Sequence, residues 1–343
     1  MNEPANFKRL LMLTTGGTIA SRSHGEGLAP EFRAGDILRF IPAFPDSIDI
    51  DTKEVCSIDS TNMTPVHWLA IADAIRSCYD AYDGFVILHG TDTMAYTAAA
   101  LSYLIQDSPK PIVLTGAQKP IDRDITDSKS NLINAFRYAA FDGASGVQIV
   151  FDGKVILGTR AKKIRTKSYH AFSSINYPDL ASVCDGRIFS YIREPKCSSP
   201  LFFERLDPSV ALVKLIPGED ASFLRWRLSR CRAVIIESFG VGGVPTEGGF
   251  YEAVKDAVAA GKTVVITTQV ESEGSDIGVY QVGYRLKGLA GVLEAYDMTL
   301  EAVVTKLMWV LAQTADPAEI KQMFYTPVAH DILGNPADLS SLH

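Results

Sequence analysis

The chain has 343 residues, of which 47% are hydrophobic and 21% charged, and its formal net charge is −7. This length is too great for one ordinary hydrophobic core and favours two domains. The acidic balance argues against a nucleic-acid partner, and no apolar run approaches the ~18 residues that a membrane-spanning helix needs.

The five cysteines are widely spaced and include no C-x-x-C pair: Cys56, Cys78, Cys184, Cys197 and Cys231. An odd count with this spacing favours neither a disulfide framework nor a zinc site. It is typical of free thiols in a reducing compartment, so we expect a cytoplasmic protein. The apolar run "LLML" near the N-terminus is too short for a signal peptide. No metal or cofactor motif is found, and we predict that none is bound.

Short apolar runs alternate with helical patterns along the first half of the chain. Runs typical of strands buried on both faces cover 9–13, 84–88, 111–115 and 147–151. Segments 64–79 and 128–141 show helical spacing instead, and the first opens with Thr64 as N-cap and Pro65 after it. This alternation predicts a mostly parallel sheet with helices on both sides.

The second half has a different organisation. Asp152-Gly153 between two apolar runs predicts a two-residue hairpin. A stretch rich in proline, serine and charge predicts a linker at 195–209. Apolar runs at 210–215, 233–238 and 263–269 follow. We therefore expect an α/β fold: a larger N-terminal three-layer domain (1–194) with a mostly parallel sheet plus a hairpin, and a smaller C-terminal α/β domain (210–343).

Two basic segments resemble known motifs only superficially. Gly261-Lys262-Thr263 lacks the earlier glycine of a P-loop, since Asp256 stands there, and Gly261 is better explained as the glycine that ends a helix. The run 160–167 contains five basic residues. A solvated surface segment is favoured over a nucleic-acid patch, and a third alternative is that one lysine turns inward to a carboxylate.

Polar segments follow the predicted strands of the N-terminal domain. They are "TTGGTIAS" from residue 14, "IDSTNM" before the helix at 64, "HGTDT" from residue 89 and "TGAQ" from residue 115. In an open α/β sheet, ligands bind outside the carboxyl ends of the strands, so these segments are candidates for one site. The simpler alternative is that Thr91, Asp92 and Thr93 cap the next helix.

The residue types in these segments suit one kind of chemistry. A threonine nucleophile needs a base, and an Asp–Lys pair beside a second threonine can relay its proton. Asp92 could hold a substrate ammonium while Ser60 and Thr61 bind a carboxylate. Such a site suits a small amino-acid-like molecule, and hydrolytic acyl transfer fits best.

Several segments resemble bacterial L-asparaginases, the cytoplasmic type I group most closely. They are "TTGGTIAS", "IDSTNMTP", "GFVILHGTDTMAYTAAALSY" and "GTRAKKIRTKSYHAF", with further similarity in "IIESFGVGGVP", "VYQVGY" and "KLMWVLAQ". The resemblance implies hydrolysis of L-asparagine to L-aspartate and ammonia through a threonine acyl-enzyme. It also implies a homo-oligomer, a tetramer built from close dimers.

Carried over by motif, the resemblance implies Thr18 as the nucleophile and Thr91, Asp92 and Lys163 as the second threonine with its relay. The register of Arg160 relative to the lysines favours Lys163 over Lys162. The substrate-binding candidates are Asp59, Ser60, Thr61, Thr91, Asp92 and Ala117.

Three positions depart from the family pattern. Relatives often carry a tyrosine in the mobile loop after the nucleophile, where Leu28 stands near the expected place. We expect Leu28 to act as an apolar latch. Glu237 replaces an arginine and Gly243 an asparagine of the type I pattern. These two changes bear on allosteric binding of asparagine and on the contribution of a neighbouring subunit to the site.

Three other functions compete with an asparaginase. A broader glutaminase-asparaginase would share all of these motifs. The asparaginase-like subunit of a tRNA-dependent amidotransferase carries an extra N-terminal domain, for which the segment before residue 14 leaves no room. A non-catalytic amino-acid or nucleotide binder would need the pocket without a reactive hydroxyl.

Overall fold

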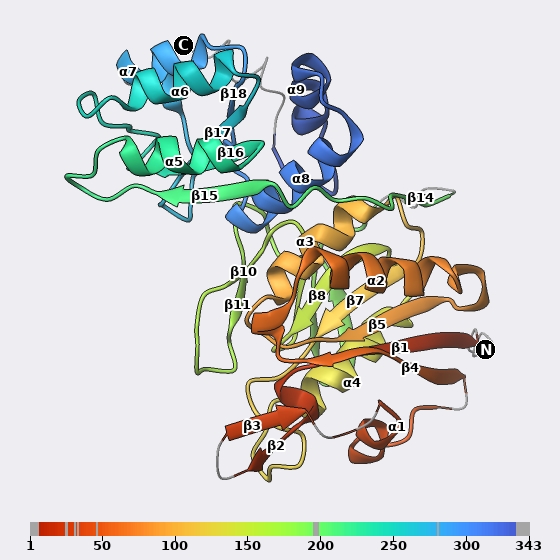
Figure 1. Ribbon diagram of the computed structural model, residues 1–343. Helices are drawn as coiled ribbons and strands as arrows, with labels where there is room; N and C mark the ends of the chain where they lie inside the picture. Colours follow the sequence, from red (N-terminus) through yellow and green to blue (C-terminus); the bar gives the residue numbers. More distant parts are fainter. Residues whose placement is uncertain are drawn as a thin grey trace. The chain divides into compact units, whose positions relative to one another are not determined.

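The computed structural model describes residues 7–24, 27–30, 32, 34–45, 47–194, 199–279 and 281–333, without the side chains of 20–24, 27–30 and 282. The chain forms two compact units, Met1–Glu204 and Arg205–His343. Each unit contains a largely parallel sheet with helices (Figure 1), so the predicted α/β fold class is confirmed.

The sheet of the larger unit has eight strands. Their order is β13 (Arg187–Ser190), β12 (Ala181–Cys184), β9 (Lys154–Leu157), β8 (Gly146–Phe151), β7 (Pro111–Thr115), β5 (Gly84–Leu88), β1 (Lys8–Gly16) and β4 (Ile48–Ile58). Strands β4, β1, β5, β7 and β8 are parallel to one another. Strand β9 returns antiparallel to β8. The hairpin residues Asp152 and Gly153 have φ of 49° and 74°, as a primed turn requires, which confirms the predicted hairpin.

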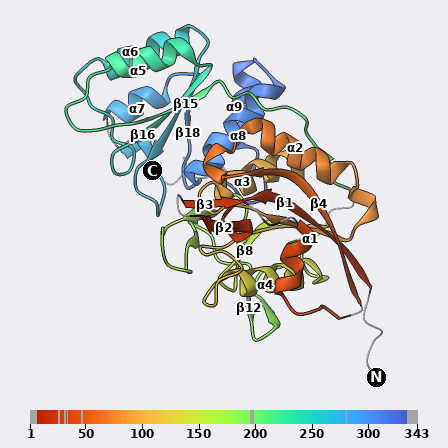
Figure 2. The same cartoon turned by 60° about the horizontal axis from the view of Figure 1, so that its bottom comes forward.

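Helices cover both faces of this sheet. They are α1 (Ala34–Ile37), α2 (Pro65–Arg76), α3 (Met94–Leu104) and α4 (Ser128–Ala139). Figures 1 and 2 show α2 and α3 on one face and α1 and α4 on the other. Leu10 and Met12 of β1 share a buried cluster with Phe136 of α4. Helix α2 begins as predicted, with Thr64 at the N-cap and Pro65 after it.

Smaller elements complete the larger unit. Short 3-10 helices are η1 (Thr18–Ala20), η2 (Leu38–Phe40), η3 (Ser60–Asn62) and η4 (Tyr79–Ala81). Three two-stranded pairs are β2 (Ser21–His24) with β3 (Gly27–Pro30), β6 (Ile105–Gln106) with β14 (Leu201–Phe202), and β10 (Ala161–Lys163) with β11 (Phe172–Ser174). Strand β14 lies inside the predicted linker, and residues 195–198 of that linker lie outside the described residues.

The smaller unit has a four-stranded parallel sheet. Its strands are β15 (Val210–Lys214), β16 (Ala233–Ser238), β17 (Thr263–Thr268) and β18 (Val292–Glu294), in that order. Its helices are α5 (Ser222–Arg230), α6 (Phe250–Ala259), η5 (Ile277–Val279), α7 (Gln281–Lys287), α8 (Leu300–Gln313) and α9 (Pro317–Tyr325). Gly261 has φ of 77° just after α6, which confirms it as the glycine that ends the helix.

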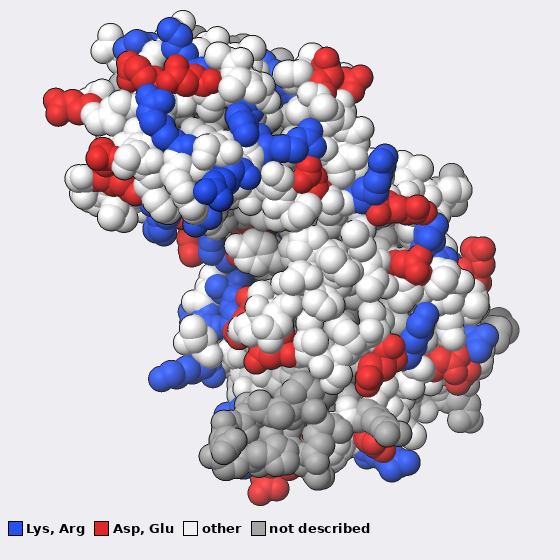
Figure 3. All heavy atoms as spheres, in the orientation of Figure 1, with Lys and Arg blue, Asp and Glu red and all other residues white. Residues whose placement is uncertain are grey.

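The surface carries both signs of charge. Lys and Arg side chains are interspersed with Asp and Glu on the face shown in Figure 3. None of the helices in the described ranges is long and apolar enough to cross a membrane.

Candidate active site

Four adjacent strands direct their following loops to one edge of the larger sheet. Strands β4, β1, β5 and β7 are neighbours and parallel, so their carboxyl ends lie together. The loops that follow them are 59–61, 17–18, 89–93 and 116–118. The structure therefore brings together the polar segments that the sequence singled out, at the edge where open α/β sheets bind ligands.

Glycines allow three of these loops to approach one another closely. A Cβ on Gly17, whose φ is 82°, would lie 2.5 Å from Cα of Gly90. A Cβ on Gly90 would lie 2.6 Å from Oγ of Ser60. Any side chain at Gly17 or Gly90 would separate the loops. Thr18 directly follows this contact at the start of η1 and is partly exposed.

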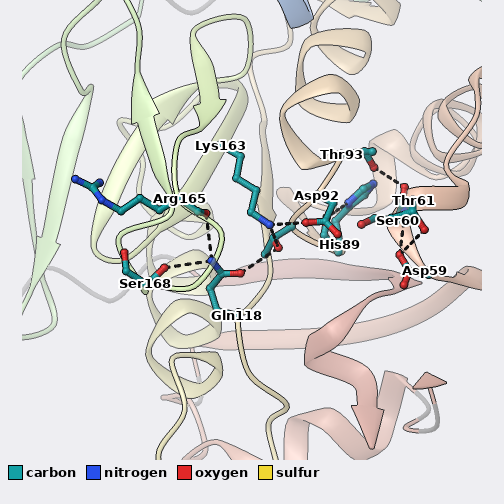
Figure 4. Close-up of polar contacts among 12 residues, drawn as sticks. Asp59, Ser60, Thr61, His89, Asp92, Thr93, Gln118, Lys163, Arg165 and Ser168 are labelled. Atoms are coloured by element: carbon teal, nitrogen blue, oxygen red, sulfur yellow. Dashed lines mark hydrogen bonds and ion pairs between the residues drawn. The ribbon is translucent and has the colours of Figure 1, made fainter. Parts of the chain in front are cut away.

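Lys163 joins this edge from strand β10. Its Nζ donates to Oγ1 of Thr91 at 2.8 Å and lies 2.5 Å from Oδ1 of Asp92 (Figure 4). Because successive side chains of a strand point to opposite faces, only one of Lys162 and Lys163 can face this site. The structure selects Lys163, and it shows that the basic run turns one lysine inward to a carboxylate.

The three polar residues differ in exposure. Thr91 is buried, and the Lys163 side chain is 15% exposed, whereas the Asp92 side chain is 57% exposed. The Lys163 end of the ion pair is therefore mostly buried, whereas the Asp92 end is accessible to solvent or to a ligand. A cationic group on a small ligand could reach Asp92 without displacing the lysine.

Gln118, which the sequence analysis did not select, completes the hydrogen bonding of Thr91. The Thr91 hydroxyl donates to Oε1 of Gln118 at 3.3 Å. Nε2 of Gln118 donates to the Ser168 carbonyl at 3.2 Å, in the segment that follows Lys163. Gln118 thus ties the loop after β7 to Thr91 and to the segment carrying the lysine. The one available signal was its position in "TGAQ", directly after a buried strand.

A buried carboxylate holds the same loop. Asp127 accepts the backbone N–H of Gln118 at 2.8 Å and that of Lys119 at 3.1 Å. Burial raises the pKa of Asp127, and these N–H donors oppose that rise. The predicted binding residue Ala117 is buried within this braced loop.

The loop after β4 places the remaining candidates. Asp59 Oδ1 accepts both the backbone N–H and the hydroxyl of Thr61, each at 2.9 Å. Ser60 is buried, and its carbonyl accepts a hydrogen bond from Thr93 Oγ1 at 2.7 Å. The Thr61 hydroxyl is therefore engaged by Asp59, and the Ser60 hydroxyl faces Gly90.

The helix-capping interpretation holds for the position of Thr93 but not for its side chain. Thr93 occupies the N-cap position of α3 but makes no capping hydrogen bond with its side chain. Its hydroxyl is drawn to the Ser60 carbonyl instead, because the loop after β4 lies against this strand end. Thr91 and Asp92 face Lys163.

The remaining predictions about this site concern Leu28 and a metal ion. The side chain of Leu28 lies outside the described residues, although the backbone pairs Leu28 with Ser23 between β3 and β2. The latch role of Leu28 therefore stays a prediction. Within the described part of the chain, no group of three or more His, Cys, Asp or Glu side chains is placed to hold a metal ion.

The smaller unit holds the other two departures from the family pattern. Glu237 lies near the carboxyl end of β16, nearly buried, with Lys214 Nζ 3.6 Å from its carboxylate. Gln269 Nε2 donates to the Glu237 carbonyl at 3.0 Å. Gly243 closes a tight turn with Phe239, whose N–H it accepts at 3.0 Å.

Comparison with known proteins gives matches along both units. Residues 9–196 match the family model described as "Asparaginase, N-terminal", and residues 209–324 match "Glutaminase/Asparaginase C-terminal domain". The chain is 39% identical to an L-asparaginase of Thermococcus kodakarensis, covering 95% of this chain and 100% of that protein. It is 35% identical to L-asparaginase 1 of Escherichia coli, over 92% and 95% of the two chains.

A relative with a different name also matches. The chain is 35% identical to a subunit of the glutamyl-tRNA(Gln) amidotransferase of Pyrococcus furiosus, covering 94% of this chain and 76% of that protein.

Solved structures resemble the whole fold. The Thermococcus kodakarensis L-asparaginase superposes with a TM-score of 0.90, covering 95% of this chain and 99% of that one. L-asparaginase I of Vibrio cholerae gives a TM-score of 0.84 at 31% identity, covering 96% of this chain and 100% of that one.

Proposed function

The chain belongs to the asparaginase family, and we propose that it hydrolyses L-asparagine to L-aspartate and ammonia through an acyl-enzyme on Thr18. The observation that carries this proposal is the hydrogen-bonded set of Lys163, Thr91 and Asp92 at the same sheet edge as the turn bearing Thr18. The named L-asparaginases that match along nearly their whole length support it further.

The first half of the reaction breaks the amide bond. Oγ1 of Thr18 forms a bond to the side-chain amide carbon of asparagine, the C–N bond breaks, and ammonia leaves. The proton of the Thr18 hydroxyl goes to the departing nitrogen. In the second half, water attacks the ester, one of its protons returns to Thr18, and aspartate is released. No cofactor is needed for either half, because the only changes are acyl transfer and proton transfer.

Thr91 is the proposed proton carrier. Its hydroxyl oxygen accepts a hydrogen bond from Lys163, and its hydrogen is donated to Gln118. The hydroxyl is therefore oriented before the substrate binds. The Lys163 ammonium also pairs with the Asp92 carboxylate, which holds the lysine beside Thr91. A positioned acid–base group of this kind contributes about 10²–10⁴-fold to the rate of a proton-transfer step.

The remaining candidates are proposed to bind the substrate. Asp92, exposed on one side, pairs with the α-ammonium group. Ser60 and Thr61, the latter positioned by Asp59, take the α-carboxylate. Ala117 contributes the backbone of the loop braced by Asp127.

The experiment that tests this function is ammonia release by the purified protein in a coupled assay. Comparable turnover of L-glutamine would identify a broader glutaminase-asparaginase. Ammonia release only in the presence of glutamyl-tRNA would favour the amidotransferase subunit, whose named relative matches at lower identity. Binding of asparagine without turnover would leave an amino-acid binding protein.

We further propose a homo-oligomer, built as a dimer of dimers, in the cytoplasm. A neighbouring structure is named a probable cytoplasmic L-asparaginase, from Campylobacter jejuni, which supports the location. Free cysteines among the described residues are consistent with it. Light scattering of the active protein measures the assembly, and an active monomer would contradict this part of the proposal.

A further inference from the structure

A chain of hydrogen bonds runs beneath the candidate active site and ends on its backbone. Trp68 of α2 donates its indole Nε1–H to Oγ1 of Thr97 in α3 at 2.9 Å. Thr97 Oγ1 lies 2.8 Å from Nε2 of His89, and Nδ1 of His89 lies 2.7 Å from the carbonyl oxygen of Gly90. All three side chains are buried, and His89 and Thr97 have no exposed surface.

The chemistry of the two ends sets the direction of every bond in this chain. An indole N–H can only donate, so Thr97 accepts from Trp68. A carbonyl oxygen can only accept, so the hydrogen of a neutral His89 ring must lie on Nδ1. Nε2 then accepts, and the Thr97 hydroxyl donates to it. The partners therefore determine a single tautomer, in which each polar group of the chain is satisfied.

This series of hydrogen bonds ends at the Gly90 carbonyl, where the active-site loops meet. The Gly90 carbonyl belongs to the planar peptide bond that joins Gly90 to Thr91. The direction of this carbonyl therefore fixes the orientation of the peptide plane and the position of the Thr91 Cα. The Gly90 backbone also lies against Gly17, next to Thr18, and against Ser60. The His89 carbonyl packs on Gly116, where a Cβ would lie 2.2 Å away. A small rotation of the Gly90–Thr91 peptide would thus move Thr91 relative to all of these loops.

The charge state of the ring agrees with this geometry. Burial lowers the pKa of His89 to about 4, although the hydrogen bond to the Gly90 carbonyl opposes the shift. At neutral pH the imidazole is therefore uncharged and keeps an acceptor for Thr97. The hydrogen bonds of His89 go to Thr97 and to the Gly90 carbonyl rather than to Lys163, Thr91 or Asp92, so it acts through the backbone.

We propose that His89 is a positioning residue that, as the neutral Nδ1–H tautomer, fixes the Gly90–Thr91 peptide and so aims the Thr91 hydroxyl at Lys163. This role rests on the proposed function, since it concerns the geometry of the same relay. The hydrogen bonds through Thr97 to Trp68 connect this peptide to helices α2 and α3.

Two matched substitutions separate positioning from simple packing. His89→Asn keeps an N–H donor in the place of Nδ1, and His89→Gln keeps a polar group near Nε2 but lacks the donor to Gly90. We expect His89→Gln to lower kcat about 10–10²-fold, the loss expected when reacting groups are misplaced by a fraction of an ångström to an ångström, and to change KM little. We expect His89→Asn to stay within about threefold of the wild type, because it keeps the donor.

The thermal unfolding midpoints of both variants are measured alongside. The role is only structural, and the proposal is overturned, in either of two cases. One is that kcat correlates with the unfolding midpoint rather than with the presence of an N–H donor to Gly90. The other is that His89→Asn loses as much activity as His89→Gln. A His89→Gln variant with wild-type kcat would overturn it as well.

A measurement on the unaltered protein keeps this inference separate from the proposed function. ¹⁵N-labelled histidine observed by NMR reports the tautomer and charge of His89, with a His89→Asn sample to assign its signals. We expect a neutral Nδ1–H ring at pH 7, and an Nε2–H or charged ring would overturn the inference. Wild-type protein that releases no ammonia from asparagine would refute the proposed function, and the NMR result would still decide the hydrogen-bond chain.

Discussion

Lys163 donates a hydrogen bond from its ammonium to the hydroxyl of Thr91, 72 residues away in the sequence, over 2.8 Å. The lysine arrives on a two-stranded element and the threonine on the loop after a central strand of the main sheet. Their meeting places an ammonium group beside a hydroxyl that can pass a proton. The relay proposed for amide hydrolysis depends on that charge.

Replacing Lys163 by Met should therefore lower kcat by about 10²–10⁴-fold, the range for acid–base groups. Methionine has a similar length, so packing is largely kept while the charge is lost. Lys162→Met is the matched control, because the neighbouring side chain of a strand points to the other face. Steady-state ammonia release measures both. Near-normal turnover of Lys163→Met, or a large loss in Lys162→Met, would mean that the register of the relay is wrong.

Thr18→Ala should abolish acyl-enzyme formation and reduce ammonia release to background, because no other described hydroxyl follows the Gly16-Gly17 turn. Thr18 is partly exposed, so folding should be unaffected, as circular dichroism would confirm. Mass spectrometry of rapidly quenched protein with asparagine detects the ester on the wild type. Should Thr18→Ala turn over asparagine at a near wild-type rate, Thr91 would become the nucleophile candidate.

Asparagine kinetics should be hyperbolic. The carboxylate of Glu237, near the carboxyl end of β16, stands where an arginine of the type I pattern would hold an effector carboxylate. Like charges repel, so a second asparagine gains nothing there. Initial rates over a wide range of asparagine concentrations give the Hill coefficient, which we expect to be about one. A value well above one would show that an effector site exists despite this substitution.

The ion pair between Lys306 and Asp331 should matter for stability rather than activity. Both side chains have no exposed surface, their charged atoms lie 2.6 Å apart, and burial lowers the pKa of Lys306. Lys306→Met leaves Asp331 buried without its cation and should lower the free energy of unfolding by about 3–5 kcal/mol. Lys306→Met with Asp331→Leu should recover much of that loss. Urea unfolding measures both, and a double variant no better than the single one would contradict the explanation.

His89 should make the protein less stable in acid. Its pKa is lowered from 6.5 to about 4 in the folded state, so between these values the unfolded chain binds a proton that the folded chain does not. Stability contributed by the neutral ring is therefore complete above the unfolded pKa and declines as the pH falls towards 4, by about 3 kcal/mol over the whole window.

Urea unfolding of the wild type and of His89→Asn at pH 7 and pH 4.5 tests this sign. Carboxylates contribute to acid sensitivity in both proteins, so the quantity of interest is the difference between them. We expect the wild type to lose more stability than the variant. Equal losses would show that His89 titrates normally or is not neutral in the folded protein.

Much of the fold was predictable because its signals are local. The buried strands of the larger sheet read as continuous apolar runs, since helices cover both faces. The turn at Asp152-Gly153 and the helix end at Gly261 follow from backbone conformations that favour these residues. By contrast, the sequence did not predict β4. It is an edge strand in which every residue is partly or fully exposed and which contains no apolar run. β18 was missed because it has only three residues.

The candidate site divides in the same way. The sequence by itself determined which segments form the candidate site, because a glycine turn, a Thr-Asp-Thr segment and an Arg-x-x-Lys spacing are each readable within a few consecutive residues. Only the tertiary structure decided that Lys163 faces Thr91, that Thr93 bonds the Ser60 carbonyl rather than capping its helix, and that His89 and Gln118 brace the loops. Except for the bond from His89 to the adjacent Gly90 carbonyl, these contacts join residues far apart in the sequence. A hydrogen bond to a distant group leaves no mark on the residues next to it. The same side chains could make many other hydrogen bonds. The strand order and the close backbone approach at Gly17 and Gly90 decide which of these hydrogen bonds form.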